Sequence, residues 1–170
     1  MKMKHLKSIL FATALCIGMV SFVGAQSKIA HINTQELIKS MPEMKEAQSQ
    51  LETLSKTYQT ELQSLGSEFQ KKVELYDKEA ATKTKEENTN RAKEVQTMEQ
   101  SIREFQQQAQ QDLQKKEFDL LKPITEKAKE AILKVAREQG FDYVLDSSQG
   151  VTIMADGKDL LADVKASLGI

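Results

Sequence analysis

Apolar residues recur every three or four positions over most of the chain, and this spacing predicts two long helices. From Met44 to Ala80 they form one narrow stripe along about ten helical turns. A helix over 42 to about 83 would be roughly 60 Å long at 1.5 Å per residue. A second stripe runs from Ala92 to Val135, so another long helix should follow the first.

Residues 81–90 separate the two stripes and contain only small or polar side chains, which predicts the tip of an antiparallel helical hairpin. In the second helix, Glu117 takes a position where the stripe requires an apolar residue. Pro123 lacks the amide hydrogen that would bond to the carbonyl of Asp119. We therefore expect the arm to bend or swivel at Pro123, its predicted hinge.

Short patterned segments before the hairpin predict a small β-containing part. Residues 28–32 form an apolar run that is typical of a strand. Asn33 and Glu36 have the spacing of a capping box, so a short helix should cover 34–40. Residues 40–43 repeat this pattern with the serine as N-cap, so the first long helix should begin there after a bend.

The segment after the hairpin predicts further strands and one more helix. Gly140 is suited to end the second long helix in a left-handed conformation. Residues 141–146 and 151–154 predict two strands of one β-hairpin. Asp156 and Asp159 have the spacing of the N-cap and N3 positions of a last helix.

These elements predict a mostly α protein with a small β part, in which a long antiparallel, coiled-coil-like hairpin is inserted in a small body. The body would comprise residues 26–41 and 140–170, and the hairpin arm residues 42–139. Three short strands and two small helices offer a thin core and leave strand edges unpaired, so we expect several copies to close one oligomerisation body. The apolar residues predicted to build this body are Ile29, Ile32, Phe141, Tyr143, Val144, Leu145, Val151 and Ile153.

Residues 1–25 have the pattern of a cleaved secretory signal peptide. Three lysines precede an apolar run over 8–23, and small residues stand before Gln26, the expected first residue of the mature chain. Cleavage would remove those three lysines, so 24 − 3 = 21 basic residues would face 25 acidic ones, a net charge of −4. It would also remove Cys16, the single cysteine, so the mature protein should have neither disulfides nor thiol chemistry.

The sequence contains no pattern that predicts catalysis, a metal site or a cofactor. The chain has no Trp, 5% aromatic residues and a net charge of −1, which argues against an enzyme core and against a nucleic-acid binder. His31, the one histidine of the mature chain, lies inside a predicted strand and is interpreted as a packing residue. Asp142 and Asp146 flank a strand, where Asp commonly supports turns.

The hairpin tip has a local positive charge in an otherwise acidic mature chain. Residues 71–93 contain seven basic and five acidic residues, a balance of +2, which is either random scatter or a surface for acidic clients and anionic membranes. Leu75, Phe118 and Leu121 lie off the main stripes and could contact unfolded chains, although helix–helix packing is the favoured interpretation. The residues predicted to face clients or membrane at the tip are Lys71, Lys72, Leu75, Lys78, Lys83, Lys85, Arg91 and Lys93.

Three stretches are distinctive: S-K-I-A-H-I-N at 27–33, G-F-D-Y-V-L-D at 140–146 and D-L-L-A-D-V-K at 159–165. With the long Gln/Lys/Glu-rich hairpin between them, they resemble the Skp/OmpH family of periplasmic chaperones over residues 26–170. The resemblance implies a homotrimer in which a β-body carries three helical tentacles around a cavity, without catalytic residues or cofactors. The better-known members are strongly basic, whereas this mature chain is mildly acidic, so the tips are its remaining basic surface.

The resemblance implies an ATP-independent holdase in the periplasm that captures unfolded outer-membrane proteins, prevents their aggregation and assists their delivery to the outer membrane. Many shallow contacts inside a flexible cage would suffice for this task. The alternative is a structural or adaptor coiled coil of the cell envelope, with a folded partner at the tip and no affinity for unfolded chains. The expected partners are unfolded β-barrel proteins, further copies of the chain and transiently an anionic membrane surface, but not nucleic acid.

Overall fold

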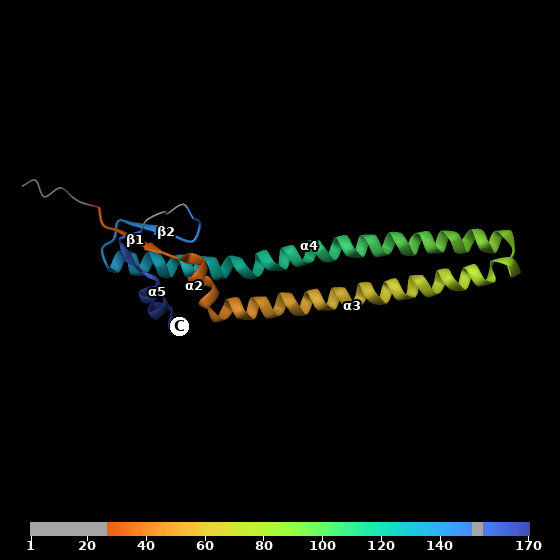
Figure 1. Cartoon of the computed structure of the whole chain (residues 1–170), viewed down its shortest axis with the longest axis horizontal. Helices are drawn as coiled ribbons and strands as arrows, with labels where there is room; N and C mark the ends of the chain where they lie inside the picture. Colours follow the sequence, from red (N-terminus) through yellow and green to blue (C-terminus); the bar gives the residue numbers. More distant parts are fainter. Residues whose placement is uncertain (1–26, 151–154) are drawn as a thin grey trace, which may run out of the picture.

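The computed structural model describes residues 27–150 and 155–170, which form a small α/β body and one long helical arm (Figure 1). The predicted signal peptide and the predicted strand 151–154 lie outside the described residues. The predicted fold class is confirmed, since a long antiparallel helical hairpin is inserted in a small β-containing body. The elements in chain order are β1 (Ile29–Ile32), α2 (Thr34–Ser40), α3 (Pro42–Glu79), the 3₁₀ turn η2 (Ala80–Thr82), α4 (Lys85–Glu138), β2 (Tyr143–Asp146), β3 (Lys158–Asp159) and α5 (Leu161–Leu168).

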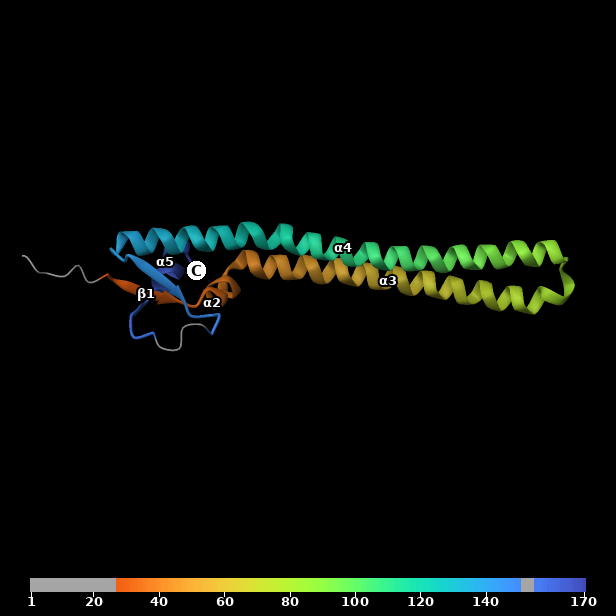
Figure 2. The same ribbon diagram turned by 90° about the horizontal axis from the view of Figure 1, so that it is seen from above.

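The arm consists of α3 and α4, which lie side by side up to the tip (Figure 2). Their apolar stripes face each other, and most stripe residues are half-buried, as two helices without a third partner require. Tyr58 on α3 packs edge-on against Phe105 on α4, with ring centroids 5.8 Å apart. Ala109 is buried in the next turn of α4. Helix α4 has 54 residues and continues past the arm into the body.

The tip is shorter than the predicted segment 81–90, because α4 already begins at Lys85. Thr84 and Glu87 form a capping box: the Thr84 hydroxyl accepts the Glu87 amide at 3.2 Å, and the Glu87 carboxylate accepts the Thr84 amide at 2.8 Å. The side chain of Asn88 donates to the carbonyl of Ala80 at 2.9 Å and ties the two helix ends together.

Of the two helix starts predicted before the arm, the structure confirms the first and contradicts the cap of the second. Asn33 caps α2 as predicted, because its side chain accepts the amide of Glu36 at 2.9 Å. Ser40 is wrong as the cap of α3, since its hydroxyl donates to the carbonyl of Leu37 at 2.7 Å. The N-cap is Met41, which offers no side-chain bond but buries its thioether in the core.

The sheet is parallel throughout, with the strand order β2–β1–β3. The predicted start of the last helix is wrong: Asp156 lies in the loop before β3, and α5 begins only at Leu161. The physical reason is that the amide of Leu160 donates to the carbonyl of His31 at 3.0 Å, which keeps the preceding residues extended alongside β1. Asp159 still helps the helix to start, since its carboxylate accepts the amide of Leu161 at 2.9 Å.

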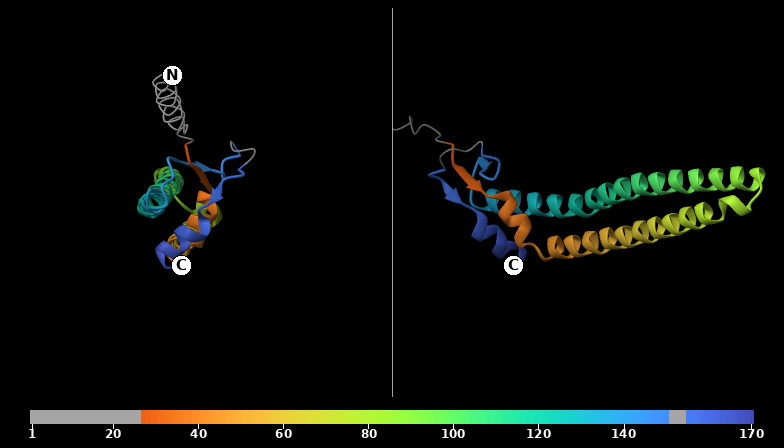
Figure 3. Two further views of the ribbon diagram at one scale, coloured as in Figure 1. Left: turned by 90° about the vertical axis from the view of Figure 1, so that its left-hand side faces the viewer. Right: turned by 45° about the vertical axis from the view of Figure 1, so that its right-hand side comes forward.

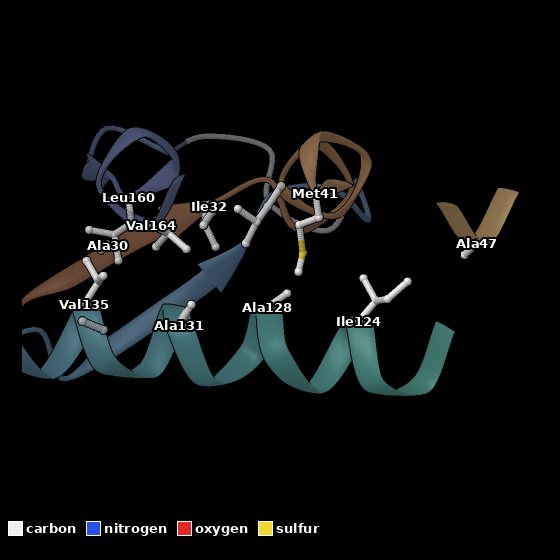
Figure 4. Packing of buried hydrophobic residues seen from close by; sticks show 12 residues of the cluster. Ala30, Ile32, Met41, Ala47, Ile124, Ala128, Ala131, Val135, Leu160 and Val164 are labelled. Atoms are coloured by element: carbon white, nitrogen blue, oxygen red, sulfur yellow. The ribbon is translucent and has the colours of Figure 1, made fainter. Parts of the chain in front are cut away.

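The core of the body lies between the sheet, α5 and the last turns of α4 (Figure 4). Figure 3 shows these body elements at the end of the arm opposite its tip. Alanines on α4 let the helix approach the strands closely. The fully buried large side chains are Ile32, Leu37, Met41, Leu160 and Val164, and the α4 residues that meet this cluster are Ile124, Ala128, Ala131, Val135 and Ala136.

Gly140 ends α4 in the left-handed conformation that the sequence predicts, with φ of 70°. Its amide donates to the carbonyl of Arg137 at 3.1 Å, and the amide of Phe141 donates to the carbonyl of Ala136 at 2.9 Å. These two bonds form a Schellman motif, which turns the chain sharply and delivers Phe141 onto the core. The turn thereby sets β2 beside β1.

Candidate functional site

One face of the sheet is apolar and exposed. The side chains of Ile29, Tyr143 and Leu145 are 48%, 61% and 44% exposed. The parallel register places Ile29 beside Tyr143 and His31 beside Leu145. Because side chains alternate along a strand, these four residues share one face, whereas Ile32 is buried on the face toward the helices. We call Ile29, His31, Tyr143 and Leu145 the sheet face.

The remaining residues predicted for the oligomerisation body have other places. Ile32 is buried, and Phe141 and Val144 are half-buried against the core of their own chain. Val151 and Ile153 lie outside the described residues. Of the residues predicted for this body, Ile29, Tyr143 and Leu145 are thus the exposed ones in the described part of the chain.

A groove follows one side of α4, and the core residues Ile32, Ala128 and Ala136 form part of its lining. It consists of two hollows that share Thr125: one of about 560 Å³ between α4, α2 and β2, and one of about 440 Å³ on α4 alone. We call this surface the lateral groove. Its larger apolar lining residues are Ile32, Ile38, Phe118, Leu121, Ile132, Leu133, Phe141 and Val144.

Phe118 is the most exposed large apolar residue in the described part of the chain, with 64% of its surface accessible. Its ring lies 6.0 Å from the ammonium of Lys122. Leu75, near the tip, is also exposed. The favoured interpretation of Phe118 and Leu75 as helix–helix packing residues is therefore wrong. Both stand about one position away from their stripes, and at 100° per residue this turns them out of the interface.

The sequence pattern identifies Leu121 as an apolar residue beside the stripe and Ile132 as part of the second stripe, but sequence reasoning missed Leu133. Leu133 follows directly on Ile132 and completes the apolar lining of the lateral groove near the body. Such apolar neighbours of stripe positions widen the apolar surface of a helix beyond what one partner covers. An apolar residue directly beside a stripe position was therefore the sequence feature that could have predicted the groove.

Five side chains join α3 to α4 near the tip, and we call them the tip cluster. The Lys72 ammonium and the Tyr76 hydroxyl both donate to the carboxylate of Glu94. Arg91 lies over the ring of Tyr76, with 4.5 Å between the guanidinium carbon and the ring centroid, and contacts Glu79 at 2.5 Å. Two of the predicted client-facing cations, Lys72 and Arg91, are thus engaged in holding the helices together.

Hydrogen bonds set the ionisation of the tip cluster. The bond from Lys72, followed by the bond from Tyr76, holds the pKa of Glu94 below its usual value. The hydrogen bond between Tyr76 and Glu94 also raises the pKa of the Tyr76 hydroxyl, and burial raises that pKa further. Glu94 is therefore an anion at neutral pH that neutralises part of the tip charge.

The other predicted tip cations are on the surface. Lys83 lies 3.8 Å from the carboxylate of Glu87, within the capping turn. In the described part of the chain, four exposed lysines of the tip are without an ion pair: Lys71, Lys78, Lys85 and Lys93. They stand among the exposed carboxylates of Glu74, Asp77 and Glu86, so the tip surface has a small excess of positive charge.

The base of the arm contains Pro123. Helix α4 runs through Pro123 without interruption, so the residue lies within one continuous helix. One turn further on, Lys127 donates to the carboxylate of Glu43 at the start of α3. This bond is the main reason why the pKa of Glu43 lies below its usual value. Pro123 and this ion pair border the same shallow hollow between the helices.

A second carboxylate joins the end of β2 to the start of α2. The carboxylate of Asp146 accepts the Thr34 hydroxyl at 2.7 Å and the Ser148 amide at 2.9 Å. Burial acts to raise the pKa of Asp146, but the bonds from Ser148 and Thr34 outweigh it, so the pKa is lowered. The predicted partner of Asp146, Asp142, instead accepts the amide of Lys28 at 2.9 Å. The two carboxylates thus support strand ends and do not converge on one site.

Over residues 27–150 and 155–170, the structure brings no three metal-ligating side chains together. None of the helices in these ranges is both long and apolar enough to span a membrane. The candidate surfaces are the sheet face, the lateral groove and the exposed lysines of the tip.

Comparisons with known proteins agree with this geometry. A family model described as outer membrane protein (OmpH-like) matches residues 28–168. The chain is 29% identical to a protein named chaperone protein Skp of Photorhabdus luminescens, over 94% of this chain and 97% of the relative. It is 26% identical to the Skp chaperone of Pectobacterium atrosepticum, over 88% and 90%.

Among solved structures, a putative outer membrane chaperone (OmpH-like) from Caulobacter crescentus has a similar fold. The TM-score is 0.74 over 85% of each chain, at 17% sequence identity. At this identity the likeness concerns the fold alone.

Proposed function

The chain belongs to the OmpH-like family, and from this membership we propose that it is a periplasmic chaperone that holds unfolded outer-membrane proteins. As a member of this family it is not an enzyme. It would act without ATP, prevent aggregation of its clients and assist their delivery to the outer membrane. The predicted signal peptide supports export to the periplasm, with cleavage before Gln26.

Phe118 is the observation that carries the proposal. A 64% exposed phenylalanine on a polar arm, continuous with an apolar groove, offers contact area that no element of the described chain uses. An unfolded β-barrel protein supplies aromatic and aliphatic side chains that fit such a surface at many registers. Weak contacts of this kind hold a client without fixing one sequence.

We propose that the protein assembles as a homotrimer through the sheet face. Three exposed apolar side chains on one small sheet, and strands β2 and β3 that each have one unpaired edge among the described residues, support contact with further copies. The arms would then project from one shared body and surround a cavity. The lateral groove of each α4 would contribute to the wall of that cavity.

The tip would provide the electrostatic part of the mechanism. Lys71, Lys78, Lys85 and Lys93 are exposed on a mature chain with a net charge of −4. Exposed lysines at the end of a long arm attract acidic clients and, transiently, the anionic surface of a membrane. Such attraction would weaken with salt, because exposed charges are screened within about 10 Å at 0.1 M ionic strength.

The test is the native mass of the mature protein by light scattering, before and after addition of a urea-diluted outer-membrane barrel protein. A trimer that gains the mass of about one client and keeps it soluble is the expected result. The proposal fails if the oligomer ignores the client while the client precipitates. A folded envelope partner bound at the tip would instead support an adaptor protein.

A further inference from the structure

His31 lies at the centre of the sheet face. It is on β1, the middle strand, between Leu145 of β2 and Asp159 of β3 in the parallel register. Its neighbours along β1, Ala30 and Ile32, are buried on the opposite face. The half-buried imidazole therefore shares its face with apolar side chains.

Few charged groups accompany His31 on this face. Strand β2 contributes the phenol of Tyr143, and β3 contributes the carboxylate of Asp159, which already accepts the amide of Leu161. Lys158 of β3 is paired with Asp163 of α5 at 3.1 Å. Helices α2, α4 and α5 pack on the other face, and no ion pair to His31 is found among the described residues.

We propose that His31 makes assembly of the body dependent on pH, with assembly favoured while the imidazole is neutral. This inference rests on the proposed association of copies through the sheet face. Burial in an apolar contact disfavours a charged imidazole, because the charge loses its hydration. Closed symmetry would also bring the imidazoles of the copies toward one axis, where protonated rings repel each other.

A second copy is the occupant that fits this face. Three of the four residues of the sheet face are apolar and exposed, and both outer strands have an unpaired edge among the described residues, so an identical sheet can continue it. Apart from Asp159, whose carboxylate accepts the amide of Leu161, the described residues of this face include no carboxylate, lysine or arginine. A strongly charged partner would therefore find little complementary charge there.

The expected effect follows from the titration of imidazole. The step from pH 8 to about pH 5.5 spans the range in which histidine side chains commonly gain their charge. If assembly requires the neutral form, the oligomer dissociation constant should rise by roughly tenfold or more over this step. Glu43, Glu87 and Glu94 have lowered pKa values and stay ionised over this range, so the arm itself should not change.

The experiment measures the oligomer dissociation constant of the mature protein by sedimentation at both pH values and constant ionic strength. His31 is the one histidine of the mature chain, since the other of the two is His5 in the predicted signal peptide. The matched variants are His31→Ile and His31→Gln, which cannot titrate and differ in polarity. Circular dichroism at both pH values establishes that each variant is folded.

The expected result is that the wild-type protein dissociates at about pH 5.5, whereas at least one folded variant assembles equally at both pH values. Equal assembly of the wild type at both pH values would overturn the role of His31 but leave the proposed assembly standing. The same holds if both variants keep the pH dependence. A wild type that is monomeric even at about pH 8 would overturn the assembly and this inference together.

Discussion

Arg91 at the start of α4 lies against the ring of Tyr76 near the end of α3, with the guanidinium carbon 4.5 Å from the ring centroid. The two residues are the centre of the tip cluster, in which Glu79 and Glu94 neutralise the cations. A long arm frays first at its free end, because few contacts hold the last turns together. The tip cluster opposes this fraying by tying both helices across the turn.

Tyr76→Ala should therefore loosen the tip and leave the body intact. Loss of the ring and of the bond to Glu94 should speed amide hydrogen exchange in the last turns of α3 and the first turns of α4 by roughly tenfold. Leu75→Ala is the matched control, since the neighbouring side chain is exposed and should leave exchange unchanged. Equal protection in both variants would show that the cluster does not hold the tip.

Two phenylalanines on α4 should separate client binding from stability. Phe118→Ala should reduce the affinity for an unfolded barrel protein several-fold and leave the melting temperature unchanged, because the ring is exposed. Phe105→Ala removes the half-buried ring that packs on Tyr58 and should destabilise the arm by about 1–3 kcal/mol. Client affinity is measured by fluorescence titration and stability by thermal unfolding. The lateral groove loses its role if Phe118→Ala binds as the wild type does.

The body should lose stability in acid through Asp146. Its folded-state pKa is lowered, so its contribution is present above the unfolded pKa of about 3.9 and disappears as the pH falls through the folded value. Asp146→Ala should cost about 1–2 kcal/mol near neutral pH and progressively less below about pH 4. Asp156→Ala, at an exposed loop position, is the control. Urea unfolding at several pH values gives the change in the free energy of unfolding for each variant. A loss for Asp146→Ala that does not depend on pH would contradict the stabilising role of the Asp146 carboxylate.

Two glycine substitutions should have opposite effects. Gly140→Ala places a side chain at φ of 70° and should destabilise the protein by about 1 kcal/mol. Gly66 lies inside α3 with open space around it, so Gly66→Ala should stabilise the arm by roughly 0.5–1 kcal/mol through helix propensity. Chemical denaturation measures both. A stabilising Gly140→Ala would mean that the Schellman turn is not required at the end of α4.

Pro123→Ala should stiffen the arm without unfolding the body. The substitution restores the amide that can bond to the carbonyl of Asp119 within a continuous helix. Spin labels on the body and near the tip should give a narrower distance distribution in the variant. Lys127→Ala, which breaks the bond to Glu43, is expected to broaden it. Equal distributions for Pro123→Ala and the wild type would exclude a hinge at this residue.

The sequence by itself determined the helical arm, because the interactions that define it are local. A stripe with a step of three or four residues makes one face apolar, and such a face must find a partner wherever the chain goes. The cap at Asn33 and the left-handed Gly140 were predictable for the same reason, since each depends on a few adjacent residues.

The tertiary structure alone decided which side chains remain available at the surface. The rotation of α3 and α4 about their axes brings Lys72 of one helix next to Glu94 of the other and leaves Phe118 facing outward. Neither arrangement can be derived from one helix alone. Strand β3 has only two residues and becomes extended through its bonds to β1, so no local pattern could predict it. The exposed sheet face likewise depends on the parallel register of strands more than a hundred residues apart, which is set by packing against α4.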